Sequence, residues 1–269
     1  MGSLDFFGTH PVFTLQEYAD SRRQGGSAHP RTVENLLAEH VKAGHVLRVR
    51  SGLFASMPAG TNPVTFSVDP YLLAGHLASD AVVAFHAALQ FRGKAYSIWK
   101  RYPYLTRKRC RPLSLPYHGA EYVAVQASKS IRNRPDLGGG IVEERHAGGT
   151  VRVTTFERTL VDIMDAPEHG GGWEEIWRSL EMVEFFDLDE VVRLTLDRSS
   201  ALTVARVGFY MDQHRDALMV EDRHLAPLHA RAPRQPRYLD RQRNSGRVVK
   251  AWNLVVPERV LNRQWEEVR

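Results

Sequence analysis

The sequence predicts an α+β protein, and three features support that class. Residues 14–55 have the patterns of two amphipathic helices followed by the pattern of a basic hairpin. A stretch of prolines and small residues, MPAGTNPVTFSVDP at 57–70, then interrupts the pattern and predicts a domain boundary. Beyond it, helix-like and strand-like segments are mixed along the chain. We therefore expect a small domain at residues 1–65 and a larger mixed α/β domain at 66–269.

The first predicted helix begins at a capping box. Thr14 and Glu17 have the spacing at which a hydroxyl and a carboxylate each accept a hydrogen bond from a free backbone N–H. A short apolar stripe follows, formed by Leu15, Tyr18 and Ala19. The segment SRRQGG at 21–26 predicts a basic, flexible turn that ends this helix.

A second predicted helix begins at Pro30 and ends at Gly44. Pro30 suits the first helical turn because it has no N–H to donate and a fixed φ, and its ring keeps His29 out of the helix. One face is apolar and is expected to be buried, with Val33, Leu36, Leu37 and Val41. The opposite face is polar and is left for solvent or a ligand, with Arg31, Thr32, Asn35, Glu39 and Lys42.

Residues 46–55 alternate in the manner of a two-stranded hairpin. Arg48 and Arg50 point to one side, the apolar residues between them point to the other, and Ser51-Gly52 permits a tight reversal. Helix, turn, helix and basic hairpin is the element order of a winged helix-turn-helix. We therefore predict that fold for residues 1–65.

This order of elements suits duplex DNA. A helix about 10 Å wide fits the major groove, where Arg31 and Asn35 can read base edges, and hairpin arginines can meet phosphate or the minor groove. The candidate DNA-binding residues are His29, Arg31, Thr32, Asn35, Lys42, Arg48 and Arg50, with Arg22 and Arg23 in the preceding turn. Two other interpretations stay open. Winged helices also bind proteins, and the same elements can have a purely structural role.

The larger domain is predicted to mix short helices and strands. Helices are expected after Asp69-Pro70 and after Ser79-Asp80, the second with the sequence AVVAFHAALQFRG. A β-rich region follows, with candidate strands at 96–99, 113–115, 122–125, 141–144 and 151–153. The remaining expected elements are helices at 173–180, 189–197 and 201–219, a strand at 248–256 and a short terminal helix.

The segment TTFERTLVD at 154–162 is the most compact motif of this domain. Thr154 and Glu157 have capping-box spacing, and Arg158 and Asp162 have the spacing of a helical ion pair. An enzymatic alternative stays open, in which a divalent metal for nucleic-acid processing is held by Glu143, Glu144, Glu157 and Asp162. Because no nucleophile, phosphate loop or His–acid pair accompanies these acids, we predict no catalytic residue, no metal and no cofactor.

Charge and composition narrow the class of protein. The net charge of +5 suits nucleic acid, and basic residues also gather at 94–111 and 223–250. KRYPYLTRKRCRP in the first of these mixes rings with cations, as single-strand binders do, whereas the second has eight basic residues and one acid, Asp240. Each of these two segments can also be interpreted as a basic surface that faces solvent and binds nothing. The single cysteine, Cys110, excludes an intrachain disulfide, and neither a membrane span nor a secretory signal is recognisable, so a cytoplasmic protein is expected.

Several of these segments together resemble the AbiEi antitoxins of type IV, abortive-infection toxin–antitoxin systems. The resemblance covers roughly residues 10–220. It is carried by FTLQEYA, HPRTVENLLAEHVKAGHVLRVRSGLFA, DAVVAFHAALQFRG, VTTFERTLVDIMDAPEHGGGWEEIWRSLE and ARVGFYMDQHR. The ERTLVD helix after a strand is the more specific part. Leu4 to Phe7 must supply the first helix of the three-helix core.

The resemblance implies a bacterial autorepressor whose winged helix binds inverted repeats in the operator of its own operon. It also implies that the C-terminal domain opposes a nucleotidyltransferase toxin, without a stable complex between the two proteins. The recognition-helix positions of the family fall on His29, Arg31, Thr32 and Asn35, and its wing positions fall on Arg48 and Arg50. A stand-alone transcription regulator without a toxin remains an alternative.

Overall fold

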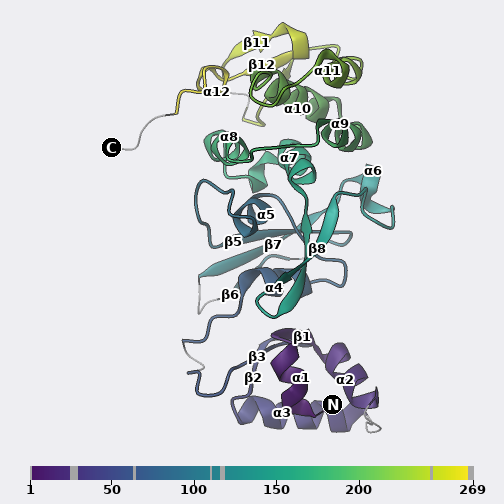
Figure 1. The fold of residues 1–269 in the computed structure, drawn as a ribbon, viewed down its shortest axis with the longest axis vertical. Coiled ribbons are helices and arrows are strands. Elements are labelled where there is room, and N and C mark those ends of the chain that lie inside the picture. Colours follow the sequence, from purple (N-terminus) through teal and green to yellow (C-terminus); the bar gives the residue numbers. More distant parts are fainter. Residues whose placement is uncertain are drawn as a thin grey trace.

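The computed structural model describes residues 2–24, 30–62, 65–109, 111–115, 119–242 and 245–265. Within these segments the chain has an α+β fold, in which helices accompany three sheets. Figure 1 shows the N-terminal elements at one end of the long axis, a sheet in the middle, and a helical part with a small sheet at the other end. No helix of the described segments is long and apolar enough to cross a membrane.

The N-terminal part folds around a small aromatic core. Its elements are α1 (Ser3–Thr9), β1 (Val12–Thr14), α2 (Leu15–Gln24), α3 (Pro30–Lys42), β2 (Val46–Arg50) and β3 (Leu53–Ser56). The strands form an antiparallel sheet in the order β1-β3-β2. The buried core consists of Phe6, Phe7, Phe13, Tyr18, Val33, Leu37, Val46 and Phe54. The helix expected from Leu4 to Phe7 is therefore present and contributes two of the core rings.

The capping box and the two glycine turns predicted for this part are confirmed. Thr14 N donates to Glu17 Oε2 (2.6 Å) and Glu17 N donates to Thr14 Oγ1 (3.2 Å), as the capping box predicts. Gly44 and Gly52 adopt φ angles of 74° and 75°, a left-handed conformation that glycine tolerates best, and they end α3 and reverse the hairpin. The prediction of a basic turn at 21–26 is wrong in part, because α2 continues to Gln24.

A mixed sheet forms the centre of the molecule. Its strands are β4 (Val82–Val83), β5 (Arg101–Thr106), β6 (Leu113–Leu115), β7 (Ala120–Gln126), β8 (Ile141–His146) and β9 (Gly149–Thr154). Their order is β6-β7-β5-β4-β9-β8, with β5 parallel to β7 and β4 parallel to β9. The accompanying helices are α4 (Pro70–His76), α5 (His86–Phe91) and α6 (Lys129–Arg132). The strands predicted at 113–115, 122–125, 141–144 and 151–153 are confirmed.

The helix predicted after Asp80 is wrong in its first half. Val82 and Val83 form the central strand β4, and α5 begins only at His86. Two β-branched residues between neighbouring strands suit a sheet buried on both faces. Asp80 does not cap a helix, because its carboxylate accepts from Thr106 Oγ1 (2.6 Å) and the backbone N–H of Arg107 (2.8 Å).

The strand predicted at 96–99 is also wrong, because side chains satisfy the backbone there. Tyr96 N donates to Ser179 Oγ (2.9 Å), and Trp99 N donates to Gln90 Oε1 (2.8 Å). The neighbouring strand β5 was not predicted, since its sequence RYPYLT was interpreted as a basic loop. Its side chains are mostly buried.

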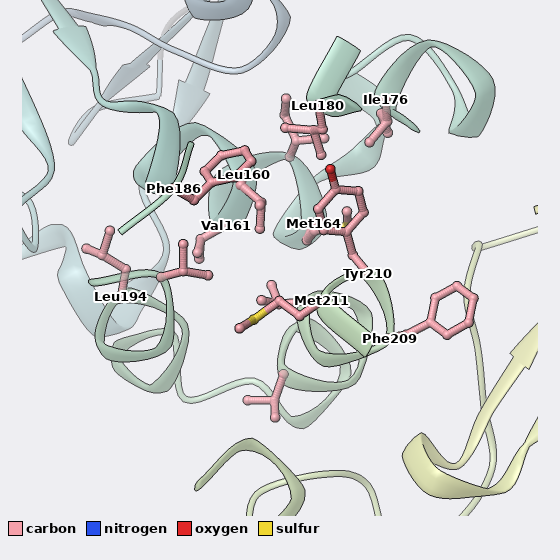
Figure 2. Packing of buried hydrophobic residues seen from close by; sticks show 14 of the residues in the cluster. Leu160, Val161, Met164, Ile176, Leu180, Phe186, Leu194, Phe209, Tyr210 and Met211 are labelled. Carbon is pink, nitrogen blue, oxygen red and sulfur yellow. The ribbon is translucent and has the colours of Figure 1, made fainter. Parts of the chain in front are cut away.

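The C-terminal part packs helices against one another and against a small sheet. The helices are α7 (Phe156–Asp165), α8 (Trp173–Glu181), α9 (Leu188–Asp197), α10 (Ala201–Gln213), α11 (Asp222–His229) and α12 (Glu258–Leu261), with 3-10 turns η1 (Pro167–His169) and η2 (Lys250–Trp252). Figure 2 shows apolar side chains of α7 to α10 in their shared core. The sheet has the order β10-β12-β11 and consists of β10 (Arg237–Tyr238), β11 (Arg247–Val249) and β12 (Leu254–Val256).

Three predictions for this part need correction. The cap of α7 is Thr155, which accepts from Arg158 N, whereas Glu157 Oε1 accepts from the backbone N–H of Asp187 (3.1 Å). The strand predicted at 248–256 is interrupted by η2 and forms two antiparallel strands. Helix α10 ends at Gln213, and α11 lies in a segment for which no helix was predicted.

The N-terminal part contacts the centre through a shared apolar cluster. Val12, Leu53 and Ala55 of the small sheet belong to the same buried cluster as Leu72 and Leu73 of α4. These contacts lie on either side of the boundary predicted between residues 65 and 66, which itself stays a prediction.

Candidate nucleic-acid interface

Helix α3 presents an open polar face. Arg31, Thr32 and Asn35 are all exposed, and their side chains make no ion pair or hydrogen bond with any residue that the structure describes. Arg31 and Asn35 are one helical turn apart, so they lie next to each other on one face. Val33 and Leu37, 4% and 2% exposed, fix the orientation of that face by entering the aromatic core. The predicted polar face is therefore accessible along the first two turns of α3.

The hairpin β2–β3 places its two arginines in different environments. Arg48 is exposed opposite Phe54 and has no ion pair with a described residue. Arg50 donates from Nη2 to the backbone oxygen of Leu77 (2.6 Å), beyond the end of α4. Arg48 is therefore available to an anionic ligand, whereas Arg50 holds the hairpin against the central part.

The other candidate residues are less free. Lys42 pairs with Glu39 (3.0 Å) and Arg23 pairs with Asp20 (2.8 Å), both at exposed positions where such pairs contribute little to stability. Arg22 lies on the same last turn of α2 as Arg23. His29 lies outside the residues that the structure describes. The Lys42 pair also offsets the negative charge of Glu39, which would otherwise repel phosphate.

A groove of about 530 Å³ runs between α3 and the hairpin. Its floor is apolar, formed by Leu15, Leu37, Ala38, Val41 and Phe54. Glu34, Lys42 and Arg48 line it with charge. The sequence analysis did not foresee this groove, because Ala38 on an exposed helix position carries no signal of its own. An apolar floor with mixed charge is a feature of protein-binding grooves as much as of DNA-binding surfaces.

The distal end of α3 adds little positive charge. His40 packs edge-on against Phe7 (ring centroids 4.9 Å apart) and lies 3.3 Å from His45 between the two Nδ1 atoms. Burial, and after it the charges of His45 and Arg22, lower the pKa of His40 below its ordinary value of 6.5. The imidazole is therefore neutral at neutral pH. The positive charge on α3 that is not already paired is that of Arg31.

The four acids of the metal-enzyme alternative serve separate partners. Glu144 pairs with Arg92 (2.7 Å), Glu157 accepts from the N-terminal turn of α9, and Asp162 is buried between Arg158 and Arg198. Glu143 lies apart from them in a groove beside β9. Among the described residues, no group of three or more His, Cys, Asp or Glu side chains is arranged to hold a metal ion. The metal alternative thus has no assembled site in these segments.

The aromatic and basic stretch at 100–112 does not form a stacking surface. Tyr102 and Tyr104 are 8% and 2% exposed and belong to the sheet core. Arg107 is occupied by the carboxylate of Asp80 and by backbone oxygens of residues 132, 134 and 135. The rings are therefore inaccessible to bases, and the interpretation of this stretch as a single-strand binder is wrong for its described residues.

Comparisons with known proteins indicate a fold and no more. No protein-family model matches the chain, and no curated protein matches it. Among solved structures, the chain is similar to the crystal structure of the RV2827C protein from Mycobacterium tuberculosis, with a TM-score of 0.56 and 18% identity. The similarity covers 94% of this chain and 89% of the other. At this identity the two proteins share an architecture over nearly their whole length.

Proposed function

We propose that the N-terminal part is a winged helix-turn-helix that binds duplex DNA, with α3 as the recognition helix and β2–β3 as the wing. The observation that carries this proposal is the pair of exposed cations, Arg31 and Arg48, without partners among the described residues. Asn35 lies one turn after Arg31, where an amide can make two hydrogen bonds to adenine. The helix supplies base contacts and the wing supplies phosphate contacts.

The biological role that we propose is that of a transcriptional autorepressor acting as the antitoxin of a type IV toxin–antitoxin system. Its C-terminal domain would oppose a nucleotidyltransferase toxin. This step is supported by the sequence resemblance to AbiEi antitoxins over roughly residues 10–220. A stand-alone regulator of the same architecture is the alternative, and the absence of a neighbouring nucleotidyltransferase gene would favour it.

Replacing Arg48 with alanine is expected to weaken binding to any duplex, and to reduce the slope of log K against log salt by about 1, because one phosphate contact is lost. Fluorescence anisotropy on operator and scrambled duplexes at several salt concentrations measures both effects. Arg134→Ala is the matched control, since it removes the same charge from an arginine already bound to Asp197 (2.7 Å). Equal losses in the two variants would show that only net charge matters.

Replacing Asn35 with alanine is expected to act differently from Arg48→Ala. It should relax the preference at one base pair, at a cost of about 1–3 kcal/mol for the preferred sequence, and leave the salt slope unchanged. Binding to a set of operators, each with one base pair changed, measures that preference. An unchanged preference at every position would contradict the placement of α3 in the major groove.

Protein binding is the second candidate function of the N-terminal part, and the apolar groove between α3 and the hairpin favours it. Ala38→Glu adds a charge to the groove floor without removing a proposed DNA contact. If this part binds DNA, the variant should lose only the small amount of DNA affinity that repulsion between the added carboxylate and phosphate accounts for. If it binds a protein, the variant loses that partner and DNA binding is absent in the wild type.

A further inference from the structure

The turn of the hairpin β8–β9 lies where the N-terminal part meets the centre. A Cβ added to Gly148 would lie 3.3 Å from Pro11 Cγ, just before β1. A Cβ added to Gly149 would lie 2.6 Å from Leu72 Cδ2 of α4. Figure 1 shows β8 reaching from the central sheet toward the N-terminal elements, beside α4. The turn is therefore packed against both parts of the molecule.

A groove of about 820 Å³ lies beside this turn, and its volume is in the range of small-molecule sites. We call it the β9 groove. Three segments line it: residues within 9–17 of the N-terminal part, residues within 72–79 at α4, and residues within 143–152 of the hairpin. A ligand in the β9 groove would therefore contact both parts at once.

The register of the hairpin turns four polar side chains to one face. Glu143 of β8 lies opposite Arg152 of β9. Two positions along β8, Arg145 lies opposite Thr150, so all four side chains point the same way. Val151 points to the other face and is fully buried. The polar face lines the β9 groove, and its two arginines are diagonal neighbours about 7–8 Å apart.

Both arginines of this face are available to a ligand. Neither Arg145 nor Arg152 forms an ion pair or a side-chain hydrogen bond with a residue that the structure describes. By contrast, Arg92 pairs with Glu144 of the same hairpin (2.7 Å). A guanidinium group can donate two parallel N–H bonds to a phosphate, and two such groups at this spacing can share one phosphate. The pair therefore has the chemistry of a phosphate-binding site.

The β9 groove also holds hydrogen-bond acceptors. The carboxylate of Glu143 has no ion pair with a described residue. His76 Nδ1 donates to the backbone oxygen of Leu72 (2.7 Å), so Nε2 of the neutral ring remains an acceptor. Glu17, the other acid of the groove, already accepts from the N–H and hydroxyl of Thr14. Sugar hydroxyls would satisfy the acceptors of Glu143 and His76, whereas a phosphate ion alone would be repelled by Glu143.

We propose that the β9 groove binds a small phosphate ester that carries hydroxyl groups, a sugar phosphate or a nucleotide. Arg145 and Arg152 bind the phosphate, and Glu143 and His76 accept from the hydroxyl groups. Duplex DNA fits the groove poorly, because its backbone has no free hydroxyl groups for these acceptors. No residue of α3 lines the β9 groove, so the site is separate from the proposed recognition helix and does not depend on it.

Isothermal titration calorimetry of the full chain with ribose 5-phosphate, AMP and inorganic phosphate tests the proposal. Ribose 5-phosphate is expected to bind more tightly than inorganic phosphate. Arg145→Ala and Arg152→Ala should each weaken its binding about 10-fold or more, because each removes hydrogen bonds from a charged donor. Glu143→Ala should abolish the preference for the ester over inorganic phosphate. Tighter binding of AMP than of ribose 5-phosphate would identify a nucleotide as the ligand, and the reverse order a sugar phosphate.

Arg237→Ala is the matched control. Arg237 is also an exposed strand arginine without an ion pair to a described residue, but it lies in β10 of the C-terminal sheet. This variant should bind ribose 5-phosphate like the wild type, and a loss equal to that of Arg152→Ala would mean that only net charge matters and would overturn the proposal. Absence of binding by both esters at millimolar concentration would overturn it as well.

Duplex DNA is the competing ligand of the two arginines, and its binding is measured separately. Arg145→Ala/Arg152→Ala is expected to leave the salt slope of duplex binding unchanged. A slope reduced by about 1.8, the value for two lost phosphate contacts, would assign these arginines to the DNA contact and overturn the proposal.

Discussion

Replacing Asp162 with asparagine is expected to lower the free energy of unfolding by about 3–5 kcal/mol. Asp162 is 4% exposed and is shared by two buried guanidinium groups, with Arg158 Nε 2.9 Å away and Arg198 on its other oxygen. Burial lowers the pKa of Arg198, and the charge of Asp162 opposes that effect. Three nitrogen atoms of these arginines already have no hydrogen-bond partner within the described structure. Loss of the carboxylate charge would also remove the ion-pair partner that the two buried guanidinium groups share.

Urea denaturation followed by circular dichroism measures this effect. Asp197→Asn is the matched control, because Asp197 also receives two arginines, Arg134 and Arg193, but at the surface. There we expect a loss below about 1 kcal/mol. Similar losses in the two variants would contradict the structural role of Asp162 and reopen its interpretation as a functional acid.

The second large effect concerns Glu175, which anchors the segment between α5 and β5. Its carboxylate lies 2.9 Å from His86 Nε2 and accepts from the backbone N–H (2.9 Å) and the hydroxyl of Ser97. Burial by itself raises the pKa of Glu175, but the hydrogen bonds from His86 and Ser97 outweigh it and lower the pKa from 4.5 to about 2. A depressed pKa in the folded state means that the ionised group stabilises the fold above pH 4.5, and that this contribution is lost as the pH falls toward 2.

Glu175→Gln should therefore cost about 3 kcal/mol of unfolding free energy at neutral pH. The difference between wild type and variant should shrink between pH 4.5 and 2. Denaturation curves over this pH range measure it, with Glu174→Gln as the control because its partner Arg178 and its own side chain are partly solvent-exposed. A difference that does not change with pH would mean that the carboxylate charge is not the source of the stability.

The sequence predicted the N-terminal part well because its signals are local. Pro30, Gly44 and the Thr14–Glu17 box each act within one or two turns of chain, so neighbouring residues suffice to interpret them. The wrong predictions in the central part concern elements whose structure depends on residues far away in the sequence. Val83 becomes a strand because Tyr104 and Val153 flank it, which no local pattern reveals.

In the candidate site, too, the features set by neighbouring residues were predictable and those set by distant residues were not. Exposure of Arg31 and Asn35 follows from helical periodicity alone, whereas the bond from Arg50 to Leu77 joins positions 27 residues apart and could not be foreseen.

The measurement that tests the central claim most directly is a mobility shift of the wild-type protein on the DNA upstream of its own gene. It is made at two salt concentrations, against scrambled competitor of the same length. A winged-helix autorepressor should bind the upstream DNA in preference to the scrambled sequence, and should lose much of that affinity at the higher salt. Equal binding to both sequences, or no binding at low salt, would contradict the assignment of α3 as a recognition helix.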